Sequence, residues 1–267
     1  MLKTNIASNH GIIDYLGERV TLSQNGIEVP IELDFYWETT KENRVTQSLL
    51  DEWEYMFQIA CHSIPNMTDN HLSIGGGGDS RIGSVLPKSV KNWVIVNPNI
   101  LELKQVYNPH KINTILLRAI GEDIPIISNT FNSIDLLGTI DHLVDPSQAL
   151  KELHRVSKKG AQLIISVTNC DSWYKKIFRV LKISIHEDHT HSHQFTPHQL
   201  KTLLVKSGYR IVKIQTTYFL RLPLIIEKKL TNKIWRKARQ NISNHLLPKI
   251  LGKEQGGIII CTAEALK

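Results

Sequence analysis

The sequence has little of what marks secreted, membrane-spanning or fibrous proteins. Its 267 residues include three cysteines, Cys61, Cys170 and Cys261, an odd and scattered set. We therefore expect thiols in a reducing compartment and no disulfide framework. No apolar run approaches about 18 residues, which argues against a membrane-spanning helix. The first residues lack the apolar core of a signal peptide. We expect a cytoplasmic protein.

Acidic residues are nearly missing from one long segment. Residues 201–253 hold 13 of the 32 Lys and Arg residues but only one of the 25 acidic residues, Glu227. The net charge of +7 therefore comes from this segment, and the rest of the chain is mildly acidic. This distribution is atypical of a uniformly basic nucleic-acid-binding protein, and we expect no nucleic-acid partner.

The composition is that of a globular domain. With 41% hydrophobic and 21% charged residues, the chain is neither disordered nor collagen-like, and its length suits one large domain. Helical patterns lie between short apolar segments, which is typical of a parallel sheet covered on both faces. The segments predicted as strands are residues 71–74, 93–96, 114–117, 134–137, 162–167, 209–218 and 257–263.

Further elements are predicted outside this core. Residues 12–35 alternate apolar and polar side chains around Asn25-Gly26, which favours a hairpin turn, and residues 41–62 have helical spacing. Apolar residues recur every four positions from Leu222 to Leu246, which predicts one or two amphipathic helices between Pro223 and Pro248. We divide the chain into a hairpin-and-helix extension (1–65), a core (66–220), a basic helical insertion (221–255) and a final core strand (256–267).

Four glycines, Gly75 to Gly78, follow the first core strand. Glycine is needed where backbone must approach a ligand without a Cβ atom, and a strand, a turn and a helix N-terminus together form a ligand cradle. The turn is not a Walker A loop, because no Gly-Lys-Ser/Thr follows, nor GxGxxG, because Ile82 stands at the last glycine position. A connection without a ligand is the alternative.

The run Leu72-Ser-Ile-Gly-Gly-Gly-Gly-Asp79 resembles the first motif of class I S-adenosylmethionine (SAM)-dependent methyltransferases. Four further blocks resemble the same family, most closely its type-11 branch, in order and approximate spacing. They are 121–125 with 129–135, then 140–146, then 149–167, and finally 191–197 with 200–208. The resemblance covers residues 71 to 215 and the final strand.

The resemblance implies an α/β fold with a Rossmann-like seven-stranded sheet, mostly parallel with an antiparallel last strand. It also implies SAM as the cofactor and S-adenosylhomocysteine (SAH) as the product. The cofactor-binding positions that it indicates are Ser73, Ile74, Gly75, Gly76, Gly77, Asn97, Pro98, Gly121, Glu122, Asp123, Ile124, Gly138, Thr139 and Ile140.

Three positions depart from the family pattern. The family usually has acids where this chain has Ser73 and Asn97, and often one at Ile120. An amide can still accept one hydrogen bond and donate another, but losing a charged hydrogen bond costs about 1.5–3 kcal/mol. The alternative to methyl transfer is therefore a repurposed binding protein on the same fold.

Histidines dominate the candidate catalytic residues. His142 follows the fourth strand and is expected to act as a base or to orient the substrate, with Asp141 beside it; a capping or packing role is the alternative. His191 and His193 belong to the cluster 186–193, where a role as base or substrate contact, a metal site and a solvated loop are alternatives; we favour no metal. The predicted substrate-binding residues are Tyr36, Trp37, His189 and Trp173.

The acceptor is not named by any motif. A small-molecule, glycan or lipid-like acceptor, methylated at oxygen, is the favoured interpretation. For the basic segment 221–247, three roles stay open: a lid over the substrate, a contact with the membrane surface, and a homodimer interface.

Overall fold

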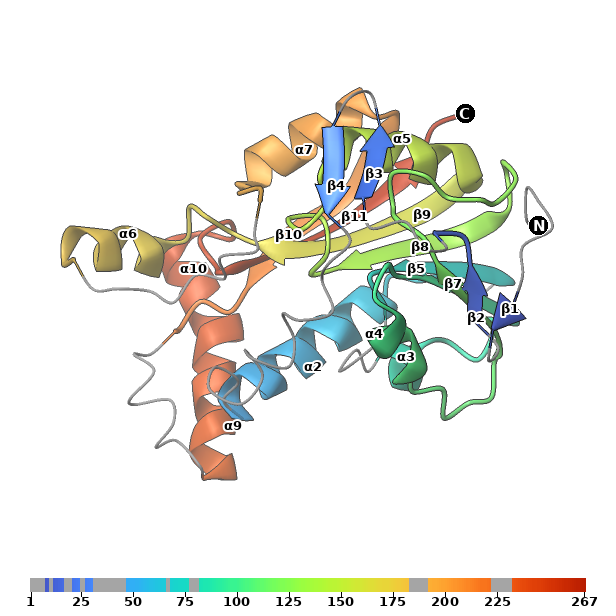
Figure 1. Cartoon of the computed structure of the whole chain (residues 1–267). Coiled ribbons are helices and arrows are strands. Elements are labelled where there is room, and N and C mark those ends of the chain that lie inside the picture. The colour runs from blue at the N-terminus through green and yellow to red at the C-terminus, as the bar shows by residue number, and fades with distance from the viewer. Residues whose placement is uncertain are drawn as a thin grey trace.

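The computed structural model describes residues 8–9, 12–16, 21–24, 27–30, 47–65, 68–76, 82–182, 192–221 and 232–267. Its main sheet has the strand order β1-β2-β7-β6-β5-β8-β9-β11-β10 (Figure 1). The seven predicted strands are all present. They are β5 (Asn70–Ile74), β6 (Asn92–Val96), β7 (Asn113–Arg118), β8 (Phe131–Leu137), β9 (Ser157–Thr168), β10 (Tyr209–Thr217) and β11 (Ile258–Ala265).

The expected count of seven strands is too low, because the sheet has nine. β2 (Ile12–Asp14) pairs in parallel with β7, and β1 (Ser8–Asn9) pairs with β2. These short strands cover the edge of β7, which would otherwise present unpaired backbone groups. The predicted hairpin around Asn25-Gly26 is confirmed by β3 (Thr21–Gln24) and β4 (Ile27–Pro30), an antiparallel pair separate from the main sheet. Residues 12–14 do not belong to it.

The strand directions agree with the expected fold. β2, β7, β6, β5, β8 and β9 pair in parallel, and β11 is antiparallel to both β9 and β10. The chain moves from β5 outward to β6 and β7, then returns to the other side of β5 as β8. In open α/β sheets, ligands bind at such a reversal, beyond the carboxyl ends of the strands.

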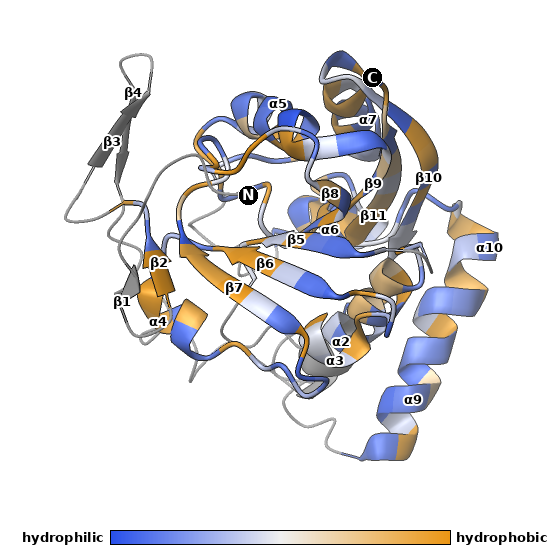
Figure 2. Cartoon of the chain, turned by 90° about the vertical axis from the view of Figure 1, so that its right-hand side faces the viewer, coloured by the Kyte–Doolittle hydropathy of each residue, from blue (hydrophilic) through white to orange (hydrophobic). Residues whose placement is uncertain are grey.

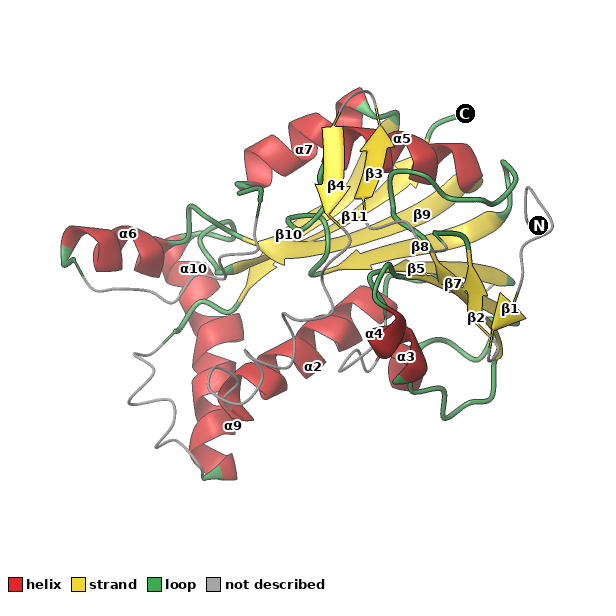
Figure 3. Ribbon diagram, in the orientation of Figure 1, coloured by secondary structure: helices red, strands yellow, loops and turns green. Residues whose placement is uncertain are grey.

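Helices cover both faces of the sheet (Figure 3). α5 (Pro146–Val156) and α7 (Pro197–Lys206) pack on one face, and α2 (Gln47–Cys61), α3 (Ile82–Val85) and α4 (Ile100–Lys104) contribute to the core on the other. Both α5 and α7 begin with proline at their first position after a capping residue, Asp145 or Thr196, which satisfies backbone N–H groups that the helix leaves open.

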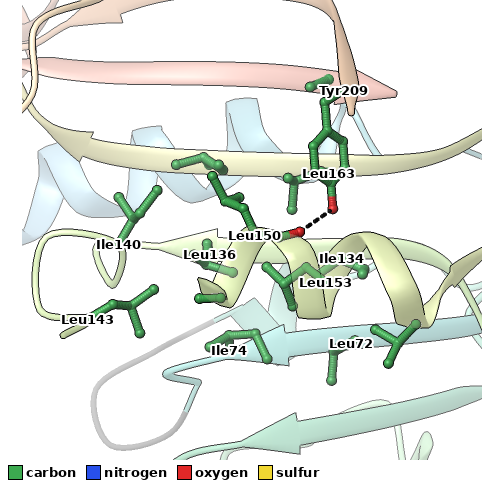
Figure 4. Close-up of a cluster of buried hydrophobic side chains, with 14 of the residues drawn as sticks. Leu72, Ile74, Ile134, Leu136, Ile140, Leu143, Leu150, Leu153, Leu163 and Tyr209 are labelled. Atoms are coloured by element: carbon green, nitrogen blue, oxygen red, sulfur yellow. Dashed lines mark hydrogen bonds between the residues drawn. The ribbon is translucent and has the colours of Figure 1, made fainter. Parts of the chain in front are cut away.

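The larger core cluster joins β5, β8 and β9 to α5 (Figure 4). Leu72, Leu136, Leu150 and Leu163 belong to this cluster, and all four side chains are fully buried. The hydroxyl of Tyr209 donates a hydrogen bond to the Leu150 carbonyl at 3.4 Å, and burial raises the pKa of this tyrosine.

The basic segment is helical where the structure describes it. α9 (Lys233–Asn241) continues through a π-helical turn, η1 (Ile242–Leu246), into α10 (Leu247–Leu251). The predicted end at Pro248 is wrong, because this proline lies in the first turn of α10, where its missing N–H is tolerated. The predicted start near Pro223 lies outside the described residues, and the division into domains stays a prediction.

The cysteines are free thiols. Cys61 and Cys261 are buried, and burial raises the pKa of Cys261 to about 12. Among the helices in the described ranges, none combines the length and hydropathy needed to cross a bilayer.

Truncating the centre of the core tests this packing. Leu163→Ala removes a fully buried side chain between β8 and β11, and should lower the free energy of unfolding by about 2–5 kcal/mol in denaturant titrations. The control Val205→Ala, on an α7 residue that is 56% exposed, should change it by less than about 0.5 kcal/mol. Equal effects would contradict the assigned core.

Candidate active site

The glycine turn after β5 is closed by a threonine from the end of β8. Gly75 has a positive φ of 72°, and a Cβ atom there would lie 2.3 Å from Oγ1 of Thr139, so no larger residue fits. The Thr139 hydroxyl lies 3.1 Å from the Ile74 carbonyl oxygen and 3.3 Å from that of Leu137. The Gly75 N–H donates to the Val96 carbonyl of β6. The ends of three strands thus meet at this turn.

A buried polar network lies directly beneath the turn. The Asp135 carboxylate on β8 accepts hydrogen bonds from the Ser73 hydroxyl and from Nε2 of His71, both on β5. Nε1 of Trp93 donates to the Ser73 oxygen at 2.9 Å, and Nδ1 of His71 lies 2.7 Å from the Ser133 hydroxyl. Ser73 is fully buried, so its side chain supports the turn from below instead of facing a ligand.

The end of β6 combines an amide with a carboxylate. Asn97 is buried, and its Nδ2 donates to Oε2 of Glu102 at 2.6 Å and to the Gly76 carbonyl at 3.3 Å. Its Oδ1 accepts from the Asn99 N–H. The acid that the sequence lacks at position 97 is therefore present five residues later, in the first turn of α4. Sequence reasoning missed Glu102, although an acid in the first turn of the next helix was the available signal.

The loop after β7 is tied to the loop after β8. Glu122 is 3% exposed, and its Oε1 accepts the N–H groups of Val144 and Asp145 at 2.9 and 3.3 Å. Burial raises the pKa of this carboxyl. Asp123 accepts a hydrogen bond from the Tyr15 hydroxyl. The two acids near the expected adenine position are thus engaged with protein groups, and their predicted cofactor contacts stay predictions.

The other predicted cofactor positions differ in which of their atoms a ligand could reach. Ile74, Ile124 and Ile140 are core residues, so only their backbone is available to a ligand. The Pro98 carbonyl accepts from Nε of Arg118. Gly121 packs against Ile74 and Leu143. Gly138 has a positive φ of 65°, and a Cβ atom there would meet nothing within 4 Å, which leaves open space at the end of β8. Gly77 lies outside the described residues.

The β8–α5 loop carries the catalytic candidates. The His142 N–H donates to the Thr139 carbonyl, so this histidine sits one turn from the residue that closes the glycine turn. The His142 side chain is 32% exposed, and its Nε2 lies 4.0 Å from Oδ1 of the buried Asp141. The N–H of His193 donates to the Asp141 carbonyl, and Nε2 of His193 lies 3.2 Å from the Val144 carbonyl. The structure therefore brings His193 to the same loop.

The remaining predicted residues are not brought to this loop by any described contact. Trp173 begins α6 (Trp173–Val180), and its Nε1 donates to the Phe219 carbonyl after β10 at 2.6 Å. His189, His191, Tyr36 and Trp37 lie outside the described residues. Within the described ranges, no three His, Cys, Asp or Glu side chains are placed to hold a metal ion.

A family model described as a methyltransferase domain matches residues 53–214. The chain belongs to this methyltransferase family. An uncharacterized protein of Methanocaldococcus jannaschii is 21% identical over 174 residues, which is 63% of this chain and 81% of that protein. The expected class I methyltransferase is thereby confirmed, with SAM as its cofactor.

Solved structures show the same fold. A SAM-dependent methyltransferase of Thermotoga maritima has a TM-score of 0.56 at 18% identity, covering 80% of this chain and 94% of that one. A chain from the complex of the Haloferax volcanii Trm112 methyltransferase activator with a methyltransferase has a TM-score of 0.62 at 12% identity, covering 90% and 100%. The [4+2]-cyclase SpnF has a TM-score of 0.57 at 13% identity, covering 84% of each chain.

The residues at this sheet edge fit SAM. Gly75 and Gly76 leave backbone without side chains, Gly138 faces open space, and Glu102 offers a carboxylate beside Asn97. A carboxylate can accept hydrogen bonds from both hydroxyls of a ribose, and its charge makes each of them stronger.

Removing the charge of Glu102 tests its role in cofactor binding. Glu102→Gln should weaken SAH binding about 10- to 100-fold in calorimetry, because a charged hydrogen bond contributes about 1.5–3 kcal/mol. Asn97→Asp in that background should recover part of the loss by returning an acid to the end of β6. Glu54→Gln, on an exposed α2 residue, is the control. An unchanged affinity for Glu102→Gln would rule the role out.

The buried Glu122 predicts a pH dependence of stability. Its pKa is raised, so its contribution to stability is complete below the ordinary value of 4.5 and is lost as the pH rises through the native pKa. Glu122→Gln keeps an acceptor oxygen but no charge, so the variant should gain stability relative to wild type as the pH rises. Denaturant unfolding between about pH 4 and 8 measures this. Parallel curves for the two proteins would contradict it.

Proposed function

We propose that this protein transfers the methyl group of SAM to an oxygen atom of a small-molecule, glycan or lipid-like acceptor, with His142 as the base. The observation that supports this proposal most strongly is the position of His142. Its side chain is 32% exposed, and its N–H donates to the carbonyl of Thr139, the residue that follows Gly138. We also propose a cytoplasmic, biosynthetic role, which the free cysteines favour.

The chain's own residues have separate tasks in this proposal. When bound, SAM supplies an electrophilic methyl group on a positively charged sulfur. The backbone of Gly75, Gly76 and Gly138 admits the cofactor closely, and Glu102 holds its sugar. Orientation of two reactants in this way can supply much of the rate enhancement.

The acceptor side needs removal of a proton. SAM would supply the methyl group and leave as SAH, and the His142 imidazole would take up the proton that the acceptor hydroxyl loses. The products are a methylated oxygen and SAH. The buried Asp141 carboxylate, 4.0 Å from Nε2, would stabilise the imidazolium by the attraction of opposite charges.

A repurposed binding function is the second candidate. It is favoured by the substitutions at Ser73, Asn97 and Ile120 and by the cyclase among proteins of similar fold. Methyl transfer from labelled SAM in a screen of hydroxyl-bearing acceptors would reject it. Absence of SAM and SAH binding up to millimolar concentration in calorimetry would instead reject the proposed methyl transfer.

Replacing the proposed base separates chemistry from binding. His142→Ala should lower the rate of methyl transfer about 10²- to 10⁴-fold, the usual contribution of a positioned base, while SAH affinity changes little. His198→Ala, on an exposed residue of α7, should leave both unchanged. An unchanged rate for His142→Ala would exclude a base role.

A further inference from the structure

The helix α9–η1–α10 is fixed to the body of the protein by polar contacts along one side. The Arg239 guanidinium donates to the Leu220 carbonyl at 2.7 Å and lies over the Tyr218 ring at 5.5 Å. The Ser243 hydroxyl accepts from the Leu220 N–H, and Asn244 Oδ1 accepts from the Tyr218 N–H. Polar contacts of Arg239, Ser243 and Asn244 therefore hold this side of the helix to the chain after β10.

Five large apolar residues of this helix are exposed to solvent. The exposed fractions are 76% for Ile234, 67% for Trp235, 42% for Ile242, 51% for Leu246 and 67% for Ile250. Trp235, Ile242, Leu246 and Ile250 form one strip, because seven residues make nearly two turns and the wider turn of η1 offsets part of the drift of the four-residue steps. Ile234 is exposed beside this strip, about 100° around the helix from Trp235. A contiguous exposed apolar strip of this kind marks an interaction surface.

Positive charge accompanies the strip, and negative charge is missing from it. Lys233, Lys237, Lys249 and Lys253 are exposed, and residues 232–253 contain neither Asp nor Glu. Figure 2 shows hydrophobic and hydrophilic residues interleaved along this helix.

The helix α6 repeats the pattern nearby. Its exposed apolar residues include Val180, followed by Leu181, which are 81% and 61% exposed. Arg179 is exposed beside them, and Lys176 is exposed and paired with Asp171 at 3.0 Å. Trp173 at its start donates to Phe219 and to Gln255. Both helices are thus anchored to the chain between β10 and β11, at the carboxyl end of β10 (Figure 1).

We propose that α6 and α9–η1–α10 form a docking surface for an anionic lipid bilayer. Aliphatic and tryptophan side chains enter the interfacial region, and the lysines pair with anionic headgroups, which is how amphipathic helices bind membrane surfaces. The surface lies at the same end of the sheet as the glycine turn, because β10 and β5 run in the same direction. The inference rests on the proposed function in one respect: a lipid-like acceptor held in the bilayer would lie near the end of the sheet that carries the glycine turn.

A second copy of the chain is less suited to this surface. A two-fold contact places the same patch on both subunits. The exposed lysines of α9–η1–α10 in one copy would then face those of the other copy without acidic partners.

Vesicle co-sedimentation of the full chain tests the proposal. Wild type should sediment with phosphatidylcholine vesicles that contain phosphatidylglycerol, less with phosphatidylcholine alone, and less as salt is raised. Ile234→Ser with Trp235→Ser should weaken binding at least about tenfold, as should Lys233→Gln with Lys237→Gln. The matched α7 controls, Val205→Ser and Lys201→Gln with Lys206→Gln, should bind as wild type does.

The proposal would be overturned if wild type does not sediment with anionic vesicles, or if all variants bind them equally. It would also be overturned if wild type binds no vesicles but forms a dimer, and the double variant Ile234→Ser with Trp235→Ser is a monomer. Calorimetry with SAH on every variant shows that the site is intact. If wild type binds no SAH, the proposed function is contradicted, whereas the vesicle result still supports the docking surface.

Discussion

The buried carboxylate of Asp135 fixes how the central strands meet. Burying a charge is costly unless it is paired and hydrogen-bonded, and the donors to Asp135 come from His71 and Ser73 on the neighbouring strand. These residues lie opposite Ser133 and Asp135 in the β5–β8 register. A slip by one residue would turn the donors to the other face of the sheet. The same register places Ile74 and Gly75 against Thr139, so the turn above depends on the network below.

Three carboxylates near the ends of the central strands have different surroundings and therefore different tasks. Asp135 lies under the turn, Glu122 joins two loops from within, and Glu102 stands at the end of β6. Positive charge is concentrated on helices at one end of the sheet. The net charge of +7 therefore comes from residues 201–253 and not from the strand ends that carry the candidate site.

The sequence predicted the architecture well because strand type and order leave a strong local signal. Apolar, β-branched runs at 93–96 and 162–167 can be recognised without tertiary context. β1 and β2 have two and three residues, too few for any periodicity, and their pairing with β7 depends on tertiary contact. The helix end was misplaced because proline at position 248 is compatible with the first turn of α10 after a π-helical turn.

For the candidate site, the sequence predicted which strand ends lie together better than how their side chains face. Topology alone brings strand ends such as Gly75, Asn97 and Gly138 to one edge. Which way a side chain faces depends on partners far away in sequence: Ser73 is turned inward by Asp135 and Trp93, and Glu122 by the loop at Val144. The Glu102 carboxylate lies beside Asn97, which becomes visible once α4 is placed beside β6.

A crystal structure of the complex with SAH tests the central claim most directly. The account predicts the amino-acid part of SAH along Gly75 and Gly76, and its ribose hydroxyls within about 3.2 Å of the Glu102 carboxylate. SAH bound away from the glycine turn, or a ribose held without Glu102, would contradict it.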